Sequence, residues 1–494
     1  MHLQYMEKKE MAAKAYLEQL RKSIDAGREA QIKTLRELIG IESVAEYQEG
    51  EMPFGEGVQK AFDYMMALGE SMGFTTFRAG GYGGHIQMDA EDPEAETLAI
   101  ICHLDTVPAG DGWSHDPFGC EEEDGFFYGR GVSDDKGPCV AALYAMKAVR
   151  DSGVSLKRSV RLILGLDEEG DWKGMEAYRK ACDPPDLGFT PDADFPVIRG
   201  EKGIMVFDIA KKFSRIGADA GLRLIKLEGG TAVNMVPGRA RALLRADNPK
   251  LYEKVQLREE SWPATDPCRI RTRRTGKSLE VAAVGQPAHG AHPQDGRNAV
   301  TALMAFLEDL PLSSEDAAEF IHFYNTCIGS ELDGSSLGCR LEDAVSGTTV
   351  VNVGLAEINR EAARITINVR YPISATAAQI YQGMMPLLEA HGLGIVKGKD
   401  EKPICFDEED PLVKTLMAVY AEHTGDIGSA PIITAGGTYA RAFDNVVAFG
   451  ALFPGDPDLM HQRDERMPVA RFFQQTAIYA DAIYRLAARE ENAS

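Results

Sequence analysis

A short apolar run that ends in charged residues constrains the fold of this chain most strongly. Residues 98–102 are apolar and include adjacent isoleucines, a composition typical of a strand buried on both faces. His103 and Asp105 follow at once, and Pro108 then prevents further strand pairing. Residues two apart on a strand point to the same side, so both side chains are expected at the carboxyl end of a strand, where α/β sheets bind ligands. Taken alone, the pair is better explained as part of an exposed loop, and the other motifs change that interpretation.

A second apolar run ends in the same way. Residues 159–166 predict another buried strand, and Asp167-Glu168-Glu169 follows it directly. Three successive carboxylates at the end of an apolar strand repel one another, and burial adds to the cost of their charges. Either a bound cation or full exposure to solvent removes that cost, so this motif leaves both explanations open.

Two further acidic motifs are ambiguous by themselves. Asp134 and Asp135 precede a helix predicted from about residue 139 to 150, where they could cap the helix or bind a metal ion. Asp192 lies in an acidic segment enclosed by Phe189 and Phe195, which makes a simple surface charge a poorer explanation. Neither motif identifies a site alone.

The length and the order of the patterns predict two domains. A chain of 494 residues exceeds the usual size of a single domain. Helical and buried-strand patterns alternate in residues 1–200 and return in 401–494, which predicts one α/β domain with a largely parallel sheet flanked by helices. Residues 201–400 instead show strand-like runs with polar alternation, and we expect them to form a large inserted α+β domain.

Charge and cysteine content restrict the partners and the compartment. The net charge of −23 argues against binding to nucleic acid, which the chain would repel. The eight cysteines are dispersed and form no Cys-x-x-Cys pair, as expected in a reducing compartment. Residues 1–28 predict an amphipathic helix without the apolar core of a signal peptide, and no stretch is apolar enough to cross a membrane. We therefore expect a soluble cytoplasmic protein.

The candidate ligands share one chemistry, because imidazole and carboxylate groups occur together without thiolate. Such a set suits zinc or manganese in a hydrolytic site, and four or five ligands with a spare glutamate fit a two-metal hydrolase. The candidates are His103, Asp134, Glu169, Asp192 and His461.

Taken together, the motifs resemble a known family. In order they are His103-Leu104-Asp105-Thr106-Val107-Pro108, Asp134-Asp135-Lys136-Gly137 after Gly129-Arg130-Gly131, Asp167-Glu168-Glu169, Pro191-Asp192-Ala193 and Met460-His461-Gln462. This series resembles the di-metal aminoacylase/carboxypeptidase-like amidohydrolases, and within them the bacterial dipeptidases of the PepV type. The resemblance covers nearly the whole chain, and five ordered motifs are far more specific than any one of them.

The resemblance implies a role for each motif. His103 and Asp192 would hold one metal ion, Glu169 and His461 the other, and Asp134 would bridge the two. Asp105 would orient His103 through a hydrogen bond. Glu168 would be the general base, which takes a proton from water and later gives it to the leaving amine. The ions are expected to be zinc, with manganese or cobalt as alternatives.

The inserted segment carries further matches to the family. His289, in Gln286-Pro287-Ala288-His289-Gly290, resembles the lid histidine that stabilises the oxyanion. Arg370 resembles the arginine that pairs with the C-terminal carboxylate of the substrate, while Asn234 and Gly437 resemble residues that contact the substrate. The plainer explanations are a loop histidine, a surface arginine, a turn asparagine and a loop glycine. His292 is assigned no role.

The predicted function is that of a di-metal dipeptidase acting on small peptides with a free amino terminus. The large insert resembles the PepV arrangement, in which one chain imitates a dimer, so we expect a monomer. An aminoacylase, a deacylase or a carboxypeptidase on the same scaffold is the nearest alternative. A catalytically inactive metal- or peptide-binding protein is the alternative from another class, although such a protein would need no general base like Glu168.

Overall fold

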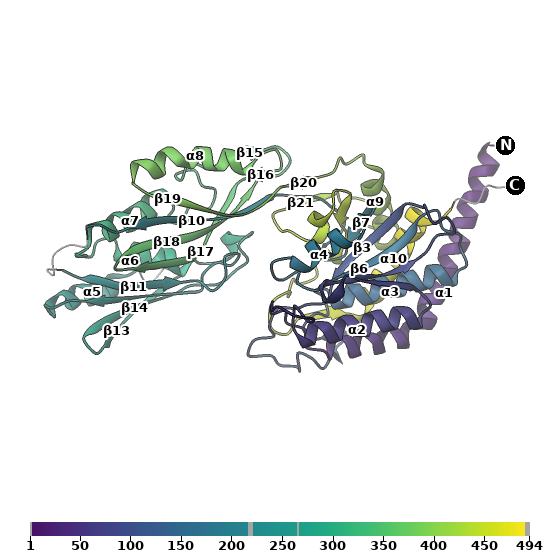
Figure 1. Cartoon of the computed structure of the whole chain (residues 1–494), viewed down its shortest axis with the longest axis horizontal. Helices are drawn as coiled ribbons and strands as arrows, with labels where there is room; N and C mark the ends of the chain where they lie inside the picture. Colours follow the sequence, from purple (N-terminus) through teal and green to yellow (C-terminus); the bar gives the residue numbers. More distant parts are fainter. Residues whose placement is uncertain (1, 216–220, 264–265, 490–494) are drawn as a thin grey trace. The chain divides into compact units, whose positions relative to one another are not determined.

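The chain folds into two compact units. The computed structural model describes residues 2–215, 221–263 and 266–489 (Figure 1). The first unit is drawn from Met1–Arg199, Phe406–Ile432 and Thr438–Ser494, and the second from Gly200–Cys405 and Ile433–Gly437. The second unit thus contains, besides the long insert, a short segment from the C-terminal part of the chain.

A mixed β-sheet forms the centre of the first unit, and its last strand, β20 (Ile404–Cys405), belongs to the second. Its strands are β1 (Thr75–Arg78), β2 (Gly84–Met88), β3 (Thr97–His103), β6 (Ser159–Gly165), β7 (Leu187–Thr190), β9 (Ile198–Glu201), β20 (Ile404–Cys405), β21 (Ile432–Thr434) and β22 (Val446–Ala448). The order is β1-β2-β6-β3-β7-β22-β9-β20, with β21 paired to β9. Strands β6, β3, β7 and β22 are parallel, whereas β1, β2 and β9 pair antiparallel. The predicted α/β fold is confirmed, and its parallel part is the middle of the sheet.

Helices cover both faces of this sheet. α1 (His2–Ile39), α3 (Lys136–Asp151) and α10 (Val469–Ala487) pack against one another on one face, where α3 and α10 contact β3 and β6 (Figure 1). α2 (Glu56–Ser71) contacts β1 and β2, and α9 (Pro411–Thr424) packs against α10. α4 (Lys173–Ala181) lies over the opposite face, where its Tyr178 hydroxyl is 2.8 Å from Nδ1 of His85 on β2.

Alternation along β3 separates the apolar core from the face that carries His103. Leu98, Ile100 and Cys102 belong to the large apolar core that includes α3 and α10. His103 has the opposite parity and lies on the other face, where its ring is 6.5 Å from that of Tyr439 in the short helix η3 (Tyr439–Ala442). The strand is therefore held by its apolar face and ends in a buried histidine on the opposite face.

Two small sheets hold the loops near the carboxyl ends of the parallel strands. β24 (Arg466–Pro468) pairs with β5 (Phe126–Tyr128), which also pairs with β4 (Glu121–Glu123). β8 (Ala193–Asp194) pairs with β23 (Ala451–Leu452). The pairing of Arg466 with Tyr128 brings the chain that follows β5 beside the chain that precedes β24, although the two are far apart in sequence.

The second unit is built on an antiparallel sheet with its own core. Its strands are β10 (Gly203–Lys212), β11 (Arg223–Gly229), β12 (Arg239–Arg245), β13 (Arg269–Thr275), β14 (Ser278–Val284), β17 (Val350–Asn359), β18 (Ala362–Tyr371) and β19 (Gly394–Glu401), in the order β13-β14-β12-β11-β17-β18-β10-β19. The helices are α5 (Lys250–Ser261), α6 (Ala299–Leu307), α7 (Glu315–Cys327) and α8 (Ala377–Ala390). Ile365, Ile367 and Val369 of β18 face the core, so Arg370 lies on the opposite face of the sheet.

Across the described residues, no helix has the length and apolar character needed to span a membrane.

We predict that Gly165→Ala destabilises the first unit. A Cβ atom at Gly165 would lie 2.2 Å from Cε2 of Tyr439, so the ring must shift, at a cost of about 1–3 kcal/mol. Gly27→Ala in α1 is the control, because its Cβ meets nothing closer than Tyr144 at 3.9 Å and should stabilise the helix by about 0.5–1 kcal/mol. Urea unfolding midpoints measure both changes, and a midpoint for Gly165→Ala at or above the wild-type value would contradict the packing described.

Candidate metal centre

The five candidate metal ligands converge at the carboxyl ends of the parallel strands. His103 ends β3, the glutamate pair Glu168 and Glu169 follows β6, and Asp192 follows β7. Asp134 lies in the loop before α3, and His461 lies in the loop before β24. Since β6, β3 and β7 are adjacent and parallel, their ends meet at one edge of the sheet.

The Asp134 carboxylate lies between the two histidines. Its Oδ1 is 2.9 Å from Nε2 of His103, and its Oδ2 is 2.9 Å from Nε2 of His461. Each oxygen thus faces a different imidazole. A carboxylate in this position can place one oxygen on each of two neighbouring cations.

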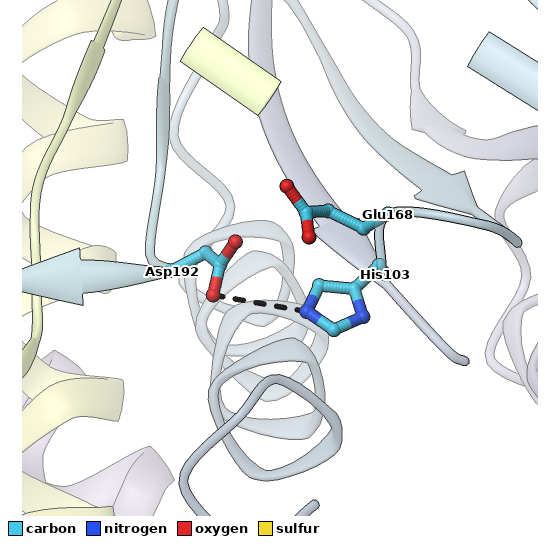
Figure 2. Close-up of side chains that lie close together, drawn as sticks. All are labelled: His103, Glu168 and Asp192. Carbon is cyan, nitrogen blue, oxygen red and sulfur yellow. Dashed lines mark ion pairs between the residues drawn. The ribbon is translucent and has the colours of Figure 1, made fainter. Parts of the chain in front are cut away.

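Further carboxylates complete a group around each histidine. Asp192 Oδ1 is 3.7 Å from Nε2 of His103, and the Glu168 carboxylate lies next to both (Figure 2). Glu169 Oε1 is 2.8 Å from Nε2 of His461. Donor atoms of His103, Glu168 and Asp192 lie within 4.8 Å of one another, as do those of His103, Asp134 and Glu169.

Asp105 contacts both the His103 ring and the main chain of the two glutamates. Nδ1 of His103 is 2.9 Å from the main-chain oxygen of Asp105 and 3.4 Å from its carboxylate oxygen Oδ1. The carboxylate also accepts hydrogen bonds from the main-chain N–H groups of Glu168 at 3.1 Å and Glu169 at 3.0 Å. One fully buried aspartate therefore contacts both the His103 ring and the loop that carries the two glutamates.

Three buried residues near the ligands were not assigned a role from the sequence. Asp135 accepts a hydrogen bond from the main-chain N–H of His103 at 3.0 Å. Arg130 and Glu465 form a buried ion pair of 2.6 Å between the loops that carry Asp134 and His461. The signal available in the sequence is weak, since an arginine between two glycines and a glutamate four residues after a histidine are common.

The carboxylates and histidines perturb one another strongly. Burial, with the nearby Asp134 charge, raises the pKa of Glu169 to about 7. Burial opposes the protonation of His461, but hydrogen bonds to Asp134 and Glu169 outweigh it and raise its pKa to about 11. Burial and the Asp192 charge hold the pKa of Glu168 well above its ordinary value. Bound protons therefore offset part of the clustered negative charge, and divalent cations at the same place would offset more of it.

The donor set fits a pair of divalent cations. Two imidazole nitrogens and several carboxylate oxygens converge, without a thiolate, around a shared aspartate. Nitrogen and oxygen donors of this kind suit zinc, manganese or cobalt in hydrolytic sites. The arrangement can activate water near a group that accepts its proton.

The predicted substrate residues belong to the second unit. Arg370 is only 4% exposed, so the interpretation as a surface arginine is wrong. Its Nε donates to Asn368 at 2.9 Å and its Nη1 to the main-chain oxygen of Ala435 at 3.0 Å, in the segment that also contains Gly437. The guanidinium is therefore held in place by its own strand and by that segment.

His289 and Asn234 are exposed neighbours within the same unit. Met235 forms an isolated β-bridge with His289, and the N–H of Gly290 donates to the main-chain oxygen of Asn234 at 2.6 Å. A Cβ atom at Gly290 would lie 2.7 Å from that oxygen, which explains glycine at this position. The two predicted substrate residues thus lie on adjacent strand-like segments.

A family model and a protein from another organism match most of this chain. The model of a family described as peptidase family M20/M25/M40 matches residues 99–485. A Staphylococcus haemolyticus protein named as a predicted dipeptidase, SH1171, is 37% identical over 461 residues, which cover 92% of this chain and 96% of that protein.

Solved structures have the same fold. Human carnosine dipeptidase 1 aligns with a TM-score of 0.55 and 15% identity, over 94% of this chain and 98% of that one. A metallo-carboxypeptidase of the M20 family from Sulfolobus solfataricus aligns with a TM-score of 0.55 and 15% identity, over 92% and 98% of the two chains. Because the identity is low, these structures bear on the fold alone.

We predict that metal binding releases protons and strengthens as the pH rises. His461, with a pKa of about 11, and Glu169, with a pKa of about 7, hold protons near neutral pH that a cation must displace. The affinity for Zn²⁺ or Mn²⁺ should therefore increase between about pH 6 and about pH 8. Calorimetric titration in buffers of different ionisation enthalpy measures the protons released. An affinity independent of pH, with heats independent of the buffer, would contradict this prediction.

Proposed function

This chain belongs to peptidase family M20/M25/M40 and is a metallo-exopeptidase, and from that premise we propose that it cleaves dipeptides with a free amino terminus. The observation that carries the proposal is the Asp134 carboxylate held between His103 and His461, with Glu168 beside them. The dipeptidase name of its relative supports the choice of substrate.

We assign two metal ions to the centre. His103 and Asp192 would hold one ion, His461 and Glu169 the other, and Asp134 would be shared. Zinc is the proposed metal, with manganese and cobalt as alternatives that accept the same donors. When bound, the ions would lower the pKa of water and polarise the carbonyl of the scissile bond.

Glu168 is assigned the role of general base. Its partly buried carboxylate lies beside His103 and Asp192 and is not assigned to either ion. Glu168 takes a proton from the attacking water and delivers it to the nitrogen of the leaving amine, so that the peptide bond breaks without release of an amide anion. Asp105 keeps the Glu168 main chain in place through the N–H bond described above.

The second unit is assigned the role of a lid that recognises the substrate. Arg370 would pair with the C-terminal carboxylate, since a guanidinium offers two parallel hydrogen bonds to such a group. Gly437 and Asn234 would contact the substrate, and His289 would donate a hydrogen bond to the oxyanion. The fixed position of Arg370 supports this assignment, because a positioned guanidinium loses little entropy on binding.

The cysteines and the second unit support the cellular and oligomeric assignments. All eight cysteines are free, as in proteins of a reducing compartment, which supports a cytoplasmic location. The second unit has its own core and a sheet of domain size, which supports an active monomer. Binding of nucleic acid or of a membrane is not part of the proposal.

An N-acyl amino acid hydrolase or a carboxypeptidase is the second candidate, because a carboxypeptidase of this family shares the fold. An inactive binding protein is disfavoured by the Glu168 carboxylate beside the candidate ligands.

We predict that Glu168→Gln lowers kcat by about 10²–10⁴-fold, since it removes the proton acceptor while keeping the shape of the side chain. The bound metal, measured by elemental analysis after dialysis, should stay at the wild-type level, since Glu168 is not assigned to either ion. Glu176→Gln is the control, an exposed glutamate in α4 of the same unit that should leave kcat unchanged. Unchanged kcat in Glu168→Gln would contradict the proposed role of Glu168 as the general base.

We predict that both ends of the substrate are recognised. A free dipeptide should be cleaved at least about tenfold faster than its N-acetylated form, and preference for the blocked form would favour the second candidate instead. Arg370→Met should raise KM for the free dipeptide, because a bidentate pair with the carboxylate is lost.

A dipeptide amide provides the internal check, since its KM should not respond to Arg370→Met. Arg364→Met is the matched control on β18, where Arg364 is 56% exposed and pairs with Asp208 and Glu357 instead. Equal effects of the two substitutions on KM would contradict the role of Arg370.

A further inference from the structure

We infer that Glu465 is a positioning residue of the metal centre, whose buried carboxylate fixes the loop that carries Asp134 to the loop that carries His461. This inference rests on the proposed two-metal centre. It concerns two loops that are more than three hundred residues apart in the chain, yet supply the shared ligand and one histidine.

The Glu465 carboxylate is fully buried and accepts hydrogen bonds from the main chain of the Asp134 loop. Oε1 accepts from the N–H of Ser133 at 2.9 Å, from Gly131 at 3.1 Å and from Asp134 itself at 3.3 Å. Oε2 is also 3.1 Å from the N–H of Gly131. A single carboxylate therefore accepts hydrogen bonds from three main-chain N–H groups of the loop. These bonds fix the position of the Asp134 backbone.

Arg130 carries the connection on to His461. Its Nη1 donates to Oε2 of Glu465 at 2.6 Å, and its Nη2 donates to the main-chain oxygen of Gln462 at 3.2 Å. Gln462 directly follows His461 in the chain. The guanidinium also lies over the ring of Trp113, 5.3 Å from its centroid, and is only 2% exposed. Glu465 thus bonds to the main chain of the Asp134 loop, and Arg130 bonds to both Glu465 and the main chain of the His461 loop.

Backbone conformation gives a second reason to expect that His461 depends on this connection. His461 has a φ of 62° and Asp464 a φ of 56°, in the left-handed region that residues other than glycine rarely adopt. Such conformations persist where surrounding contacts impose them. The bonds to the main-chain oxygen of Gln462 and to the Glu465 carboxylate are among the contacts that hold this loop, together with the bond from the N–H of Ser114 to Asp464 at 2.7 Å.

A purely structural role makes a different prediction. Asp481 on α10 is also a buried carboxylate of the first unit, and it accepts from Arg485 Nε at 2.8 Å and His423 Nε2 at 3.1 Å. Its partners are side chains of helices α9 and α10 rather than loops that carry ligands. Loss of either carboxylate should destabilise the fold, but only loss of Glu465 should change metal binding.

The experiment compares Glu465→Gln and Glu465→Asp with Asp481→Asn. Zn²⁺ and Mn²⁺ are the probes, with metal content measured after dialysis and affinity measured by competition with a chromophoric chelator. Glu465→Asp keeps the buried charge and is the variant to use if Glu465→Gln does not fold, because it only withdraws the oxygens from the loop. We expect both Glu465 variants to bind one of the two ions about 10–100-fold more weakly, and Asp481→Asn to bind both as the wild type does.

The outcomes separate this inference from the function it rests on. Wild-type protein that binds fewer than two ions would overturn the two-metal centre itself. Wild-type protein with two ions, combined with wild-type affinities in folded Glu465→Asp, would overturn only the role of Glu465. Equal loss of metal in Asp481→Asn would also overturn it, because the loss would then follow from general destabilisation. Selective loss in the Glu465 variants, with the unfolding midpoint of Asp481→Asn lowered to a similar degree, would support it.

Discussion

Repulsion among clustered carboxylates shapes the candidate metal centre of the first unit. Asp134, Glu168, Glu169 and Asp192 are gathered at one edge of a sheet, where burial and like charge raise the pKa of three of them. Two imidazoles beside Asp134 offset part of this charge, and the donor set fits two divalent cations that would offset more. The cluster is costly unless it binds cations, so its presence argues for a functional site rather than for fold stability.

The scaffold holds these charges by means of further carboxylates that bind main-chain N–H groups. Asp105 fixes the loop of Glu168 and Glu169, Asp135 fixes the end of β3, and Glu465 fixes the loop of Asp134. Hydrogen bonds from several N–H groups stabilise a buried negative charge without adding a competing metal ligand. The main chain at His103, Asp134, Glu168 and Glu169 is therefore held by three neighbouring carboxylates.

The two units differ in charge as well as in fold. The second unit has 25 acidic and 25 basic residues, so the net charge of −23 resides in the first unit. A negative potential around the metal centre favours the approach of divalent cations. The neutral second unit carries the buried Arg370, a group suited to an anionic end of a peptide. This division matches the proposed tasks, with metal chemistry in one unit and recognition in the other.

The local features of this protein could be predicted from its amino-acid order. The apolar runs that became β3 and β6, their charged ends and the order of the motifs predicted an α/β fold and a set of candidate ligands, because strand periodicity and adjacency along the chain are local properties. The ligand roles and the bound metal stay predictions. Tertiary structure alone decided which strands are neighbours, that the outer strands run antiparallel, and that Arg370 is buried. It also decided the contact of Asp105 with two glutamate N–H groups and the pairing of Arg130 with Glu465, because these contacts join segments whose distance in sequence carries no signal of their distance in space.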